Sequence, residues 1–197
     1  MKVSLLLIPL FLALAHTFTV NQLQKICTHA PASRLNAYFP HLQAALKWGN
    51  LNNCKRIAAF IAQVAQESGE FRYMEEIASG AAYEGRRDLG NTQKGDGVRF
   101  KGRGPIQLTG RNNYAAASKA LGVDLIKNPK LAADPKYAFK TAVWFWNSRG
   151  LSTHADKNTQ AAFDQITLRI NGCINCASTH KSVRDSYWRK AKSVLGC

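Results

Sequence analysis

The sequence predicts a mainly helical protein with one loop-rich segment, built as a single domain. Apolar side chains recur at helical spacing in six separate stretches of the chain. Nine glycines lie between Gly69 and Gly110, in a stretch that is rich in charges and poor in aliphatic residues. At 197 residues, the chain is long enough for one domain with a substantial core.

The first 15 residues have the pattern of a secretory signal peptide. A basic start is followed by an almost unbroken apolar run from Val3 to Leu14, and Ala13-Leu14-Ala15 offers small residues for cleavage. The run is too short to cross a bilayer comfortably, although a short anchor or a buried helix is the alternative. We expect residues 1–15 to be removed, residues 16–197 to form a secreted, extracellular domain, and no segment to span a membrane.

Two helices are predicted before the loop-rich segment. The first covers residues 34–48, where apolar and aromatic side chains have helical spacing, and Pro40 is expected to interrupt it. The second covers residues 54–67, begins after two asparagines that can cap it, and stops at Ser68-Gly69. Its alanines and its apolar positions predict a buried helix.

Glycines and charges dominate the segment from about residue 79 to residue 104, which is therefore predicted to form loops and turns. A short β-hairpin near Val98-Phe100 is the sheet element that we expect there. Helices are predicted over residues 111–121, 135–148, 158–170 and 178–194, and Asp134-Pro135 supplies a cap and a helix-starting proline. Trp144 and Trp146 have the spacing of core residues rather than that of an exposed binding platform.

The chain has a formal charge of +15, from 27 basic and 12 acidic residues spread along its length. Because the basic residues form no concentrated tract, we expect no nucleic acid among the partners. Attraction to anionic polymers or microbial surfaces would use this charge, and simple solubility is the alternative reason for it. We expect the protein to act as a monomer.

Five cysteines are present: Cys27, Cys54, Cys173, Cys176 and Cys197. In an oxidising compartment pairing is expected, and an odd number leaves one thiol or an intermolecular bridge. We expect Cys27 to pair with Cys54, since both flank an early helical region, and the other three remain unassigned. Cys173 and Cys176 form a CxxC pair without the further ligands of a zinc site, so no metal is expected.

Four acidic residues, Glu67, Glu70, Glu75 and Glu76, fall within ten positions. Glycosidases that invert the anomeric carbon need two carboxyl groups roughly 6.5–9.5 Å apart, with room for a water molecule. On one continuous helix, Glu67 and Glu76 would lie about 13.5 Å apart along the axis and on opposite faces. They can face each other only if the helix breaks at Ser68-Gly69. A solvated acidic helix end is the alternative.

Glu67 is the better candidate for a general acid, because partial burial at the end of an apolar helix favours its protonated form. Glu76, at the margin of a loop, is the better candidate for an ionised base. Further along, residues 100–114 place three glycines, a proline and several amide and hydroxyl groups around an apolar pair. Such neutral groups suit sugar hydroxyls and N-acetyl groups, although a structural turn would have the same composition.

These motifs resemble those of glycoside hydrolase family 19, the plant-type chitinases. The matching elements, which cover about residues 55–190, are Gln66-Glu67-Ser68-Gly69, Tyr73-Met74-Glu75-Glu76, Gly102-Arg103-Gly104-Pro105-Ile106-Gln107-Leu108-Thr109, Asn113-Tyr114, Leu121-Gly122-Val123-Asp124-Leu125, Ala142-Val143-Trp144-Phe145-Trp146 and Ile170-Asn171-Gly172. The resemblance implies a mainly helical, α+β lysozyme-like fold in which two helical lobes surround a substrate cleft. It implies no metal or organic cofactor.

The resemblance also assigns roles by position. Glu67 takes the place of the general acid, Glu76 that of the general base, and Thr109 that of a hydroxyl group that helps to hold the attacking water. Glu75, one position before Glu76, is the alternative candidate for the general base and is expected to point to solvent. The residues that the resemblance places against the sugar are Gln107, Asn113 and Asn171. Through an alignment that needs a short gap, Arg184 matches an arginine that neighbours the catalytic carboxylates, and it is grouped with the substrate-binding residues.

Three positions depart from the pattern of the family. Gln66 stands where histidine is usual, Glu70 where a second glycine is usual, and Asn175 where an acidic residue is common. The extra carboxylate of Glu70 would either raise the pKa of Glu67 by repulsion between like charges or face solvent. The change at Asn175 weakens the ion-pair network that the family would place around Arg184.

Residues 83–97 are similar to compact bacterial and phage members of the family, some of which act on peptidoglycan. The predicted function is the endo-acting, inverting hydrolysis of polymers that contain β-1,4-linked N-acetylglucosamine, with chitin as the preferred polysaccharide. One alternative is a peptidoglycan hydrolase with an antibacterial role. Another is a sugar-binding or antimicrobial protein without catalytic activity.

Overall fold

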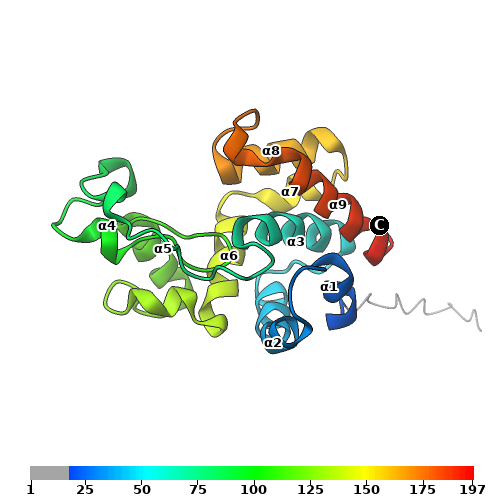
Figure 1. The fold of residues 1–197 in the computed structure, drawn as a ribbon, viewed down its shortest axis with the longest axis horizontal. Coiled ribbons are helices and arrows are strands. Elements are labelled where there is room, and N and C mark those ends of the chain that lie inside the picture. The colour runs from blue at the N-terminus through cyan, green and yellow to red at the C-terminus, as the bar shows by residue number, and fades with distance from the viewer. Residues whose placement is uncertain (1–17) are drawn as a thin grey trace, which may run out of the picture.

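The structure, a computed structural model, describes residues 18–197 and is mainly helical, as the sequence predicts (Figure 1). The proposed signal peptide, residues 1–15, lies outside the described residues. The α-helices are α1 (Val20–Ile26), α2 (Ala32–Trp48), α3 (Cys54–Ser68), α4 (Asp96–Arg99), α5 (Arg111–Leu121), α6 (Pro135–Ser148), α7 (Leu151–Ala155), α8 (Gln160–Asn171) and α9 (Lys181–Leu195). Short 3-10 helices are η1 (Ala81–Tyr83), η2 (Arg87–Leu89), η3 (Pro129–Ala133) and η4 (Ala177–Thr179).

Helix α3 is almost completely buried, because apolar or small residues occupy most of its faces. Asn53 caps its start by accepting a hydrogen bond from the Arg56 amide at 2.9 Å, and Gly69 ends it in the left-handed conformation. Helix α9 packs along it in the most extensive helix–helix contact of residues 18–197. The predicted helix, cap and stop are confirmed.

Helix α2 passes through Pro40 without interruption, so the expected break at this residue is wrong. A proline removes the hydrogen bond to the carbonyl group four positions earlier, which here belongs to Asn36. Pro40 and Asn36 are both exposed, so water can replace the missing donor. The buried residues Leu35 and Leu42 lie on another face of the helix, and α2 packs against α6.

The expected β-hairpin near Val98-Phe100 is also wrong. Val98 lies within the short helix α4, which Phe100 caps at its C-terminal end. Sheet-like pairing in the described part of the chain is limited to isolated antiparallel bridges of Glu75 with Arg103 and of Arg103 with Leu108. Phe100 is fully buried and anchors this segment to the core. A short apolar stretch in a sequence looks the same whether its residues lie in a strand or are buried in another conformation.

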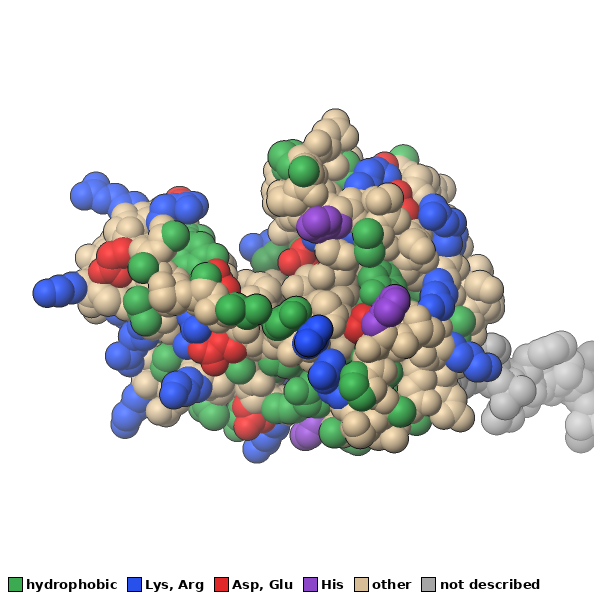
Figure 2. All heavy atoms as spheres, in the orientation of Figure 1, with side chains coloured by type: hydrophobic (Ala, Val, Ile, Leu, Met, Phe, Trp, Pro, Cys, Tyr) green, Lys and Arg blue, Asp and Glu red, His purple; other side chains and the backbone are tan. Residues whose placement is uncertain are grey.

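The buried apolar side chains form two clusters, which define two lobes. The larger lobe contains α1, α2, α3, α7, α8 and α9. The smaller lobe surrounds α4, α5 and η3, and Phe100, Leu108 and Tyr114 belong to its core. Helix α6 serves both lobes, with Phe139 in the larger cluster and Trp144 against the smaller one. Figure 2 shows the surface hollowed between the smaller lobe and the part of the larger lobe that holds α8 and α9.

One disulfide joins Cys173 to Cys176, whereas the expected pairing of Cys27 with Cys54 is wrong. Cys27 is buried at the end of α1, and its thiol is free. Cys54, at the start of α3, and Cys197, which follows α9, are also free thiols, and both pack against the core of the larger lobe. Both Cys27 and Cys54 do flank an early helical region, but the long-range packing of α9 on α3 decides which thiols meet.

None of the helices within residues 18–197 combines the length and the apolar composition that crossing a membrane requires. In the same part of the chain, no cluster of three or more histidine, cysteine, aspartate or glutamate side chains has the arrangement of a metal site.

Candidate active site

Glu67 lies in the last turn of α3, just before the helix stops. Gly69, Glu70 and Phe71 follow with positive φ angles of 56°, 54° and 63°, so the chain turns sharply away from the helix. This is the break that would allow Glu67 and Glu76 to leave a common helix. The side chain of Glu67 is mostly buried, with 19% of its surface exposed.

The buried guanidinium of Arg184, on α9, holds Glu67 in place. It donates to Glu67 Oε1 at 2.5 Å, to Gln63 Oε1 at 2.6 Å and to the Thr179 carbonyl at 2.7 Å. Gln63, one turn before Glu67 on α3, donates in turn to Thr167 Oγ1 of α8 at 2.8 Å. Glu67 is thus oriented by a network that joins α3, α8 and α9, and its Oε2 atom remains without a partner among the described residues.

This network leaves Glu67 with one oxygen bound and the other free. The pairing of Glu67 with Arg184 depends on how α9 packs against α3. Since Arg184 occupies Oε1, Oε2 is the atom on which Glu67 can present a proton to a ligand.

Replacing Arg184 by methionine should destabilise the protein by about 3 kcal/mol, because breaking a buried pair leaves the remaining partners unsatisfied. Glu67 keeps some access to water, so we expect the lower end of the usual range. Thermal unfolding should show a loss of roughly 6–12 °C. Arg189→Met, on the exposed side of the same helix, is the matched control and should change the free energy of unfolding by less than about 0.5 kcal/mol. Equal stability of the two variants would contradict the role of the network.

Glu76 is anchored to the loops next to the smaller lobe. Its Oε1 accepts a hydrogen bond from the Tyr83 hydroxyl and its Oε2 one from the Gly102 amide, each at 3.0 Å. Burial, and then the hydrogen bond and charge of Glu76, raise the pKa of Tyr83, so the phenol remains a donor. Both oxygens of Glu76 therefore have donors, which fix the orientation of the carboxyl group.

Glu76, Gln107 and Thr109 converge on Gly102. A Cβ atom at Gly102 would lie 2.6 Å from Gln107 Oε1, 3.2 Å from Glu76 Oε2 and 3.4 Å from Thr109 Oγ1. Gln107 has a φ of 55°, a conformation that is costly outside glycine and typical of functional sites. Its amide nitrogen donates to two backbone carbonyls, at 3.0 and 3.1 Å, so its orientation is fixed.

The two candidate carboxylates are therefore tied to different parts of the molecule. Glu67 is held by α8 and α9 of the larger lobe, and Glu76 is held by the loop around Gly102 that leads into the smaller lobe. The hollow in Figure 2 separates these two regions. Acid–base hydrolysis of a glycosidic bond requires two carboxyl groups that are held apart in this way.

Comparison with known proteins identifies the family. The model of the chitinase class I family, glycoside hydrolase family 19, matches residues 35–196. The chain belongs to family 19. It is 40% identical over 163 residues to an acidic 27 kDa endochitinase of Solanum lycopersicum, a match that covers 72% of this chain and 64% of that protein. It is 42% identical over 123 residues to an endochitinase of Arabidopsis thaliana, covering 60% of this chain and 40% of that protein. The chain thus spans less than two thirds of the length of these relatives.

Solved structures of family 19 members share the fold. Chitinase C from Streptomyces griseus HUT6037 is 25% identical, with a TM-score of 0.71 over 90% of this chain and 92% of that one. The class IV chitinase from Zea mays is also 25% identical, with a TM-score of 0.57 over 91% of this chain and 82% of that one. The predicted lysozyme-like architecture and the resemblance to family 19 are both confirmed.

Of the four clustered acidic residues in this family 19 chain, Glu75 forms ion pairs with basic side chains. Lys101 Nζ lies 3.2 Å and Arg103 Nη2 lies 3.3 Å from Glu75 Oε1. Burial alone would raise the pKa of Glu75, but the hydrogen bonds and charges of Lys101 and Arg103 together lower it. The side chain is 37% exposed, so it faces solvent in part, as expected, and it also forms ion pairs with Lys101 and Arg103.

Asn113 and Asn171, which the family pattern places against the sugar, both use their amide nitrogens within the protein. Asn113 Nδ2 donates to the Thr109 carbonyl at 2.8 Å. Asn171 Nδ2 donates to the Cys173 carbonyl at 3.0 Å and to Thr179 Oγ1 at 2.7 Å. These two hydrogen bonds hold the loop that contains the Cys173–Cys176 disulfide. Each amide therefore has its carbonyl oxygen left to accept a hydrogen bond from a ligand.

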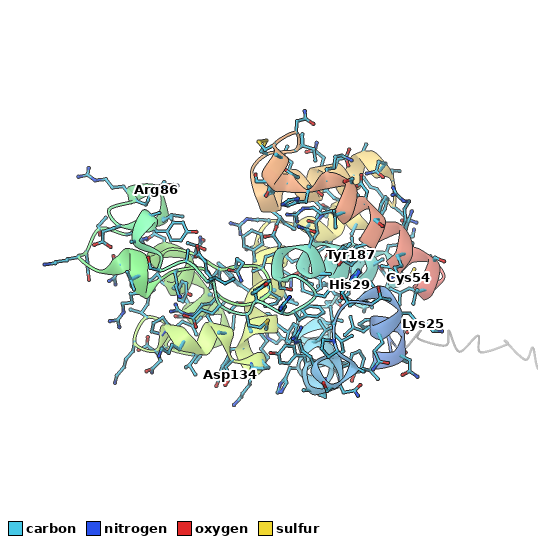
Figure 3. All side chains as sticks on the ribbon, in the orientation of Figure 1. Lys25, His29, Cys54, Arg86, Asp134 and Tyr187 are labelled. Carbon is cyan, nitrogen blue, oxygen red and sulfur yellow. A yellow bond between two sulfur atoms is a disulfide. The ribbon has the colours of Figure 1, made fainter. Side chains whose placement is uncertain are left out.

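Glu70, which replaces a glycine usual in family 19, does not face solvent. Its buried carboxylate accepts hydrogen bonds from the amides of His29 and Ala30, at 2.6 and 2.7 Å, and from the Tyr187 hydroxyl at 2.8 Å. The His29 ring also lies 3.0 Å from Glu70 Oε1, and Figure 3 shows His29 beside Tyr187. Glu70 therefore fastens the turn after α3 to the α1–α2 connection and to α9.

Trp144 and Trp146 belong to the core, as their spacing predicts. Trp146 is buried, packs edge-on against Phe60 with 5.6 Å between the ring centroids, and donates from Nε1 to Ser152 Oγ at 3.0 Å. Trp144 is half-buried against the core of the smaller lobe. Neither side chain forms an exposed platform for a sugar.

Sequence reasoning missed Gln63 and Tyr83, which position the two candidate carboxylates. Gln63 is a polar residue on the buried surface of α3, four positions before Glu67, and that spacing is a signal that the sequence does contain. Tyr83 lies in the loop-rich segment, where nothing local indicates that its hydroxyl reaches Glu76.

Proposed function

We propose that this family 19 protein is a secreted, endo-acting glycoside hydrolase that cleaves β-1,4-linked N-acetylglucosamine polymers, with chitin as substrate, and inverts the anomeric carbon. The observation that carries the proposal is the separate anchoring of two carboxylates, one by the larger lobe and the other by the loops that lead into the smaller lobe. Glu67 is held through Oε1 by Arg184, and Glu76 is held through both oxygens by Tyr83 and Gly102. The family relatives named above as endochitinases support the same substrate.

In the proposed mechanism, the sugar chain lies across the hollow and accepts hydrogen bonds from, or donates them to, Gln107, Asn113 and Asn171. Glu67 donates a proton from Oε2 to the glycosidic oxygen while positive charge develops at the anomeric carbon. Glu76 takes a proton from a water molecule that Thr109 helps to hold, and this water attacks the opposite face of the sugar. A β-linked substrate therefore gives an α-configured first product.

A second candidate function is the hydrolysis of peptidoglycan, which contains the same β-1,4 linkage within an anionic wall. The charge of +15 favours this polymer over neutral chitin. Figure 2 shows basic side chains around the rim of the smaller lobe. Its exposed basic residues are Arg86, Arg87, Lys94, Arg99, Lys119, Lys127 and Lys130.

Incubation of the purified protein with chitohexaose and, separately, with purified bacterial cell wall tests the proposal. We expect chitohexaose to be cut at internal linkages into shorter oligomers. Release of soluble wall fragments while chitohexaose stays intact would establish the second candidate instead. If neither polymer were cut, although both were bound, a sugar-binding protein without catalytic activity would be the correct description.

A further inference from the structure

Two thiols meet where α3 begins and α9 ends. Cys54 is the first residue of α3, and Cys197 follows Gly196, whose φ of 72° turns the chain after α9. The Cys197 amide donates to the Lys192 carbonyl at 3.0 Å, which fixes the direction of the chain at this point. Both side chains pack against the core of the larger lobe, and the two thiols are close enough to influence each other's pKa. Figure 1 shows the C-terminal end beside α3, and Figure 3 labels Cys54 at that end of the helix.

We propose that Cys54 and Cys197 form a disulfide bond when the protein matures in an oxidising compartment. Cys54 begins α3, Cys197 follows α9, and these two helices pack along each other, so a bond between the two side chains can form with little change in the backbone. Helices α3 and α9 run in opposite directions, and the Glu67–Arg184 pair ties the other end of the same helix pair. The disulfide would thus hold α9 against α3 and keep Arg184 in register with Glu67.

This pairing also accounts for the odd number of cysteines. Cys173 and Cys176 are already bonded, so Cys27 is the thiol that remains. Burial, and then the nearby charge of Glu70, raise the pKa of Cys27 far above its usual range. A buried thiol that stays protonated is inert toward exchange, so the unpaired cysteine is protected from bridging between molecules.

The bond can form by exchange with a small disulfide such as oxidised glutathione. The Cys54 thiolate attacks one glutathione sulfur to form a mixed disulfide, and the released glutathione thiolate takes up the proton that Cys54 lost. The Cys197 sulfur then attacks the Cys54 sulfur, and the second glutathione leaves with the proton of Cys197. Two protein thiols thereby lose two electrons, which reduce one oxidised glutathione to two thiols. Burial, and then the hydrogen bond to Cys54, raise the pKa of Cys197 to about 12, which favours Cys54 as the first attacking group.

Counting the thiols of the full chain tests the proposal directly. Protein secreted from cells, or refolded with a glutathione redox buffer, is denatured without reductant, alkylated with iodoacetamide and weighed by mass spectrometry. We expect one alkyl group, on Cys27, and a peptide pair linked through Cys54 and Cys197. Alkylation of Cys27, Cys54 and Cys197 together, or a bond from Cys54 or Cys197 to any other cysteine, would overturn the proposal.

Serine variants separate the bond from simple packing of the thiols. Cys54→Ser, Cys197→Ser and the double variant should each lower Tm by roughly 5–15 °C, and all by the same amount, because any one of them removes the whole bond. In excess reductant, the wild type and the double variant should melt within a few degrees of each other. Small, additive losses that persist in reductant would show that the thiols only pack. None of these measurements depends on enzymatic activity, so they remain valid whatever the substrate proves to be.

Discussion

Glu67→Gln should lower the rate of chitohexaose hydrolysis by roughly 10²–10⁴-fold, the usual contribution of a general acid. Glutamine has the size of glutamate, and its carbonyl oxygen can still accept the hydrogen bond from Arg184 at the position of Oε1. It has no proton of suitable acidity to donate to the leaving oxygen. Initial rates of product release, together with a circular dichroism spectrum that shows the fold intact, measure the effect.

An activated substrate makes this experiment specific for proton donation. A dinitrophenyl glycoside of a chitin oligomer has a leaving group that departs without protonation, so Glu67→Gln should recover most of its lost rate on it. A variant that had lost substrate binding would remain slow on both substrates. Full activity of Glu67→Gln on chitohexaose would show that Glu67 is not the proton donor.

Glu76→Gln should also slow the hydrolysis of chitohexaose by roughly 10²–10⁴-fold. The reason differs from that for Glu67→Gln, and a different reagent should restore the activity. Without the carboxylate, no group takes the proton from the attacking water, whereas the hydrogen bonds from Tyr83 and Gly102 can still orient the amide. The dinitrophenyl substrate should give no recovery. Added azide, a nucleophile that needs no deprotonation, should restore activity and form an α-glycosyl azide.

Glu75→Gln is the matched control for the base, because it changes the neighbouring carboxylate in the same way. Glu75 is paired with Lys101 and Arg103, so its loss should weaken the loop and reduce activity by less than about tenfold. Rescue of Glu75→Gln by azide, with none for Glu76→Gln, would reverse the assignment of the two residues.

Local signals were sufficient to predict the helices that position the site. Asn53 and Gly69 bound α3, and Asp134 with Pro135 starts α6, because caps and stops act within one turn of the backbone. The expected break at Pro40 was wrong. The free energy that a proline costs a helix depends on whether water can bind the carbonyl group left without a donor, and no local pattern reveals that exposure. The hairpin near Val98-Phe100 was wrong for a related reason, since burial of Phe100 in the core decided the local structure.

The candidate site shows the same limit. The sequence singled out Glu67 and Glu76 and, through the resemblance, Arg184. It did not reveal Tyr83, whose hydroxyl reaches Glu76 from a separate part of the loop-rich segment. The position of Glu70 was the least predictable from the sequence. Successive residues in the left-handed conformation turn its carboxylate toward the α1–α2 connection, and nothing in the neighbouring residues indicates this turn. Cysteine pairing failed likewise, since Cys54 meets a partner that only the packing of α9 brings to it.

The most direct test of the whole account is the configuration of the first product, followed by proton NMR within minutes of adding enzyme to chitohexaose. A water molecule activated by Glu76, on the face opposite to Glu67, must give the α-anomer at the new reducing end before mutarotation mixes the two forms. We predict an initial excess of the α-anomer signal that decays toward equilibrium. An initial excess of the β-anomer would mean net retention, and would contradict the roles assigned to Glu67 and Glu76.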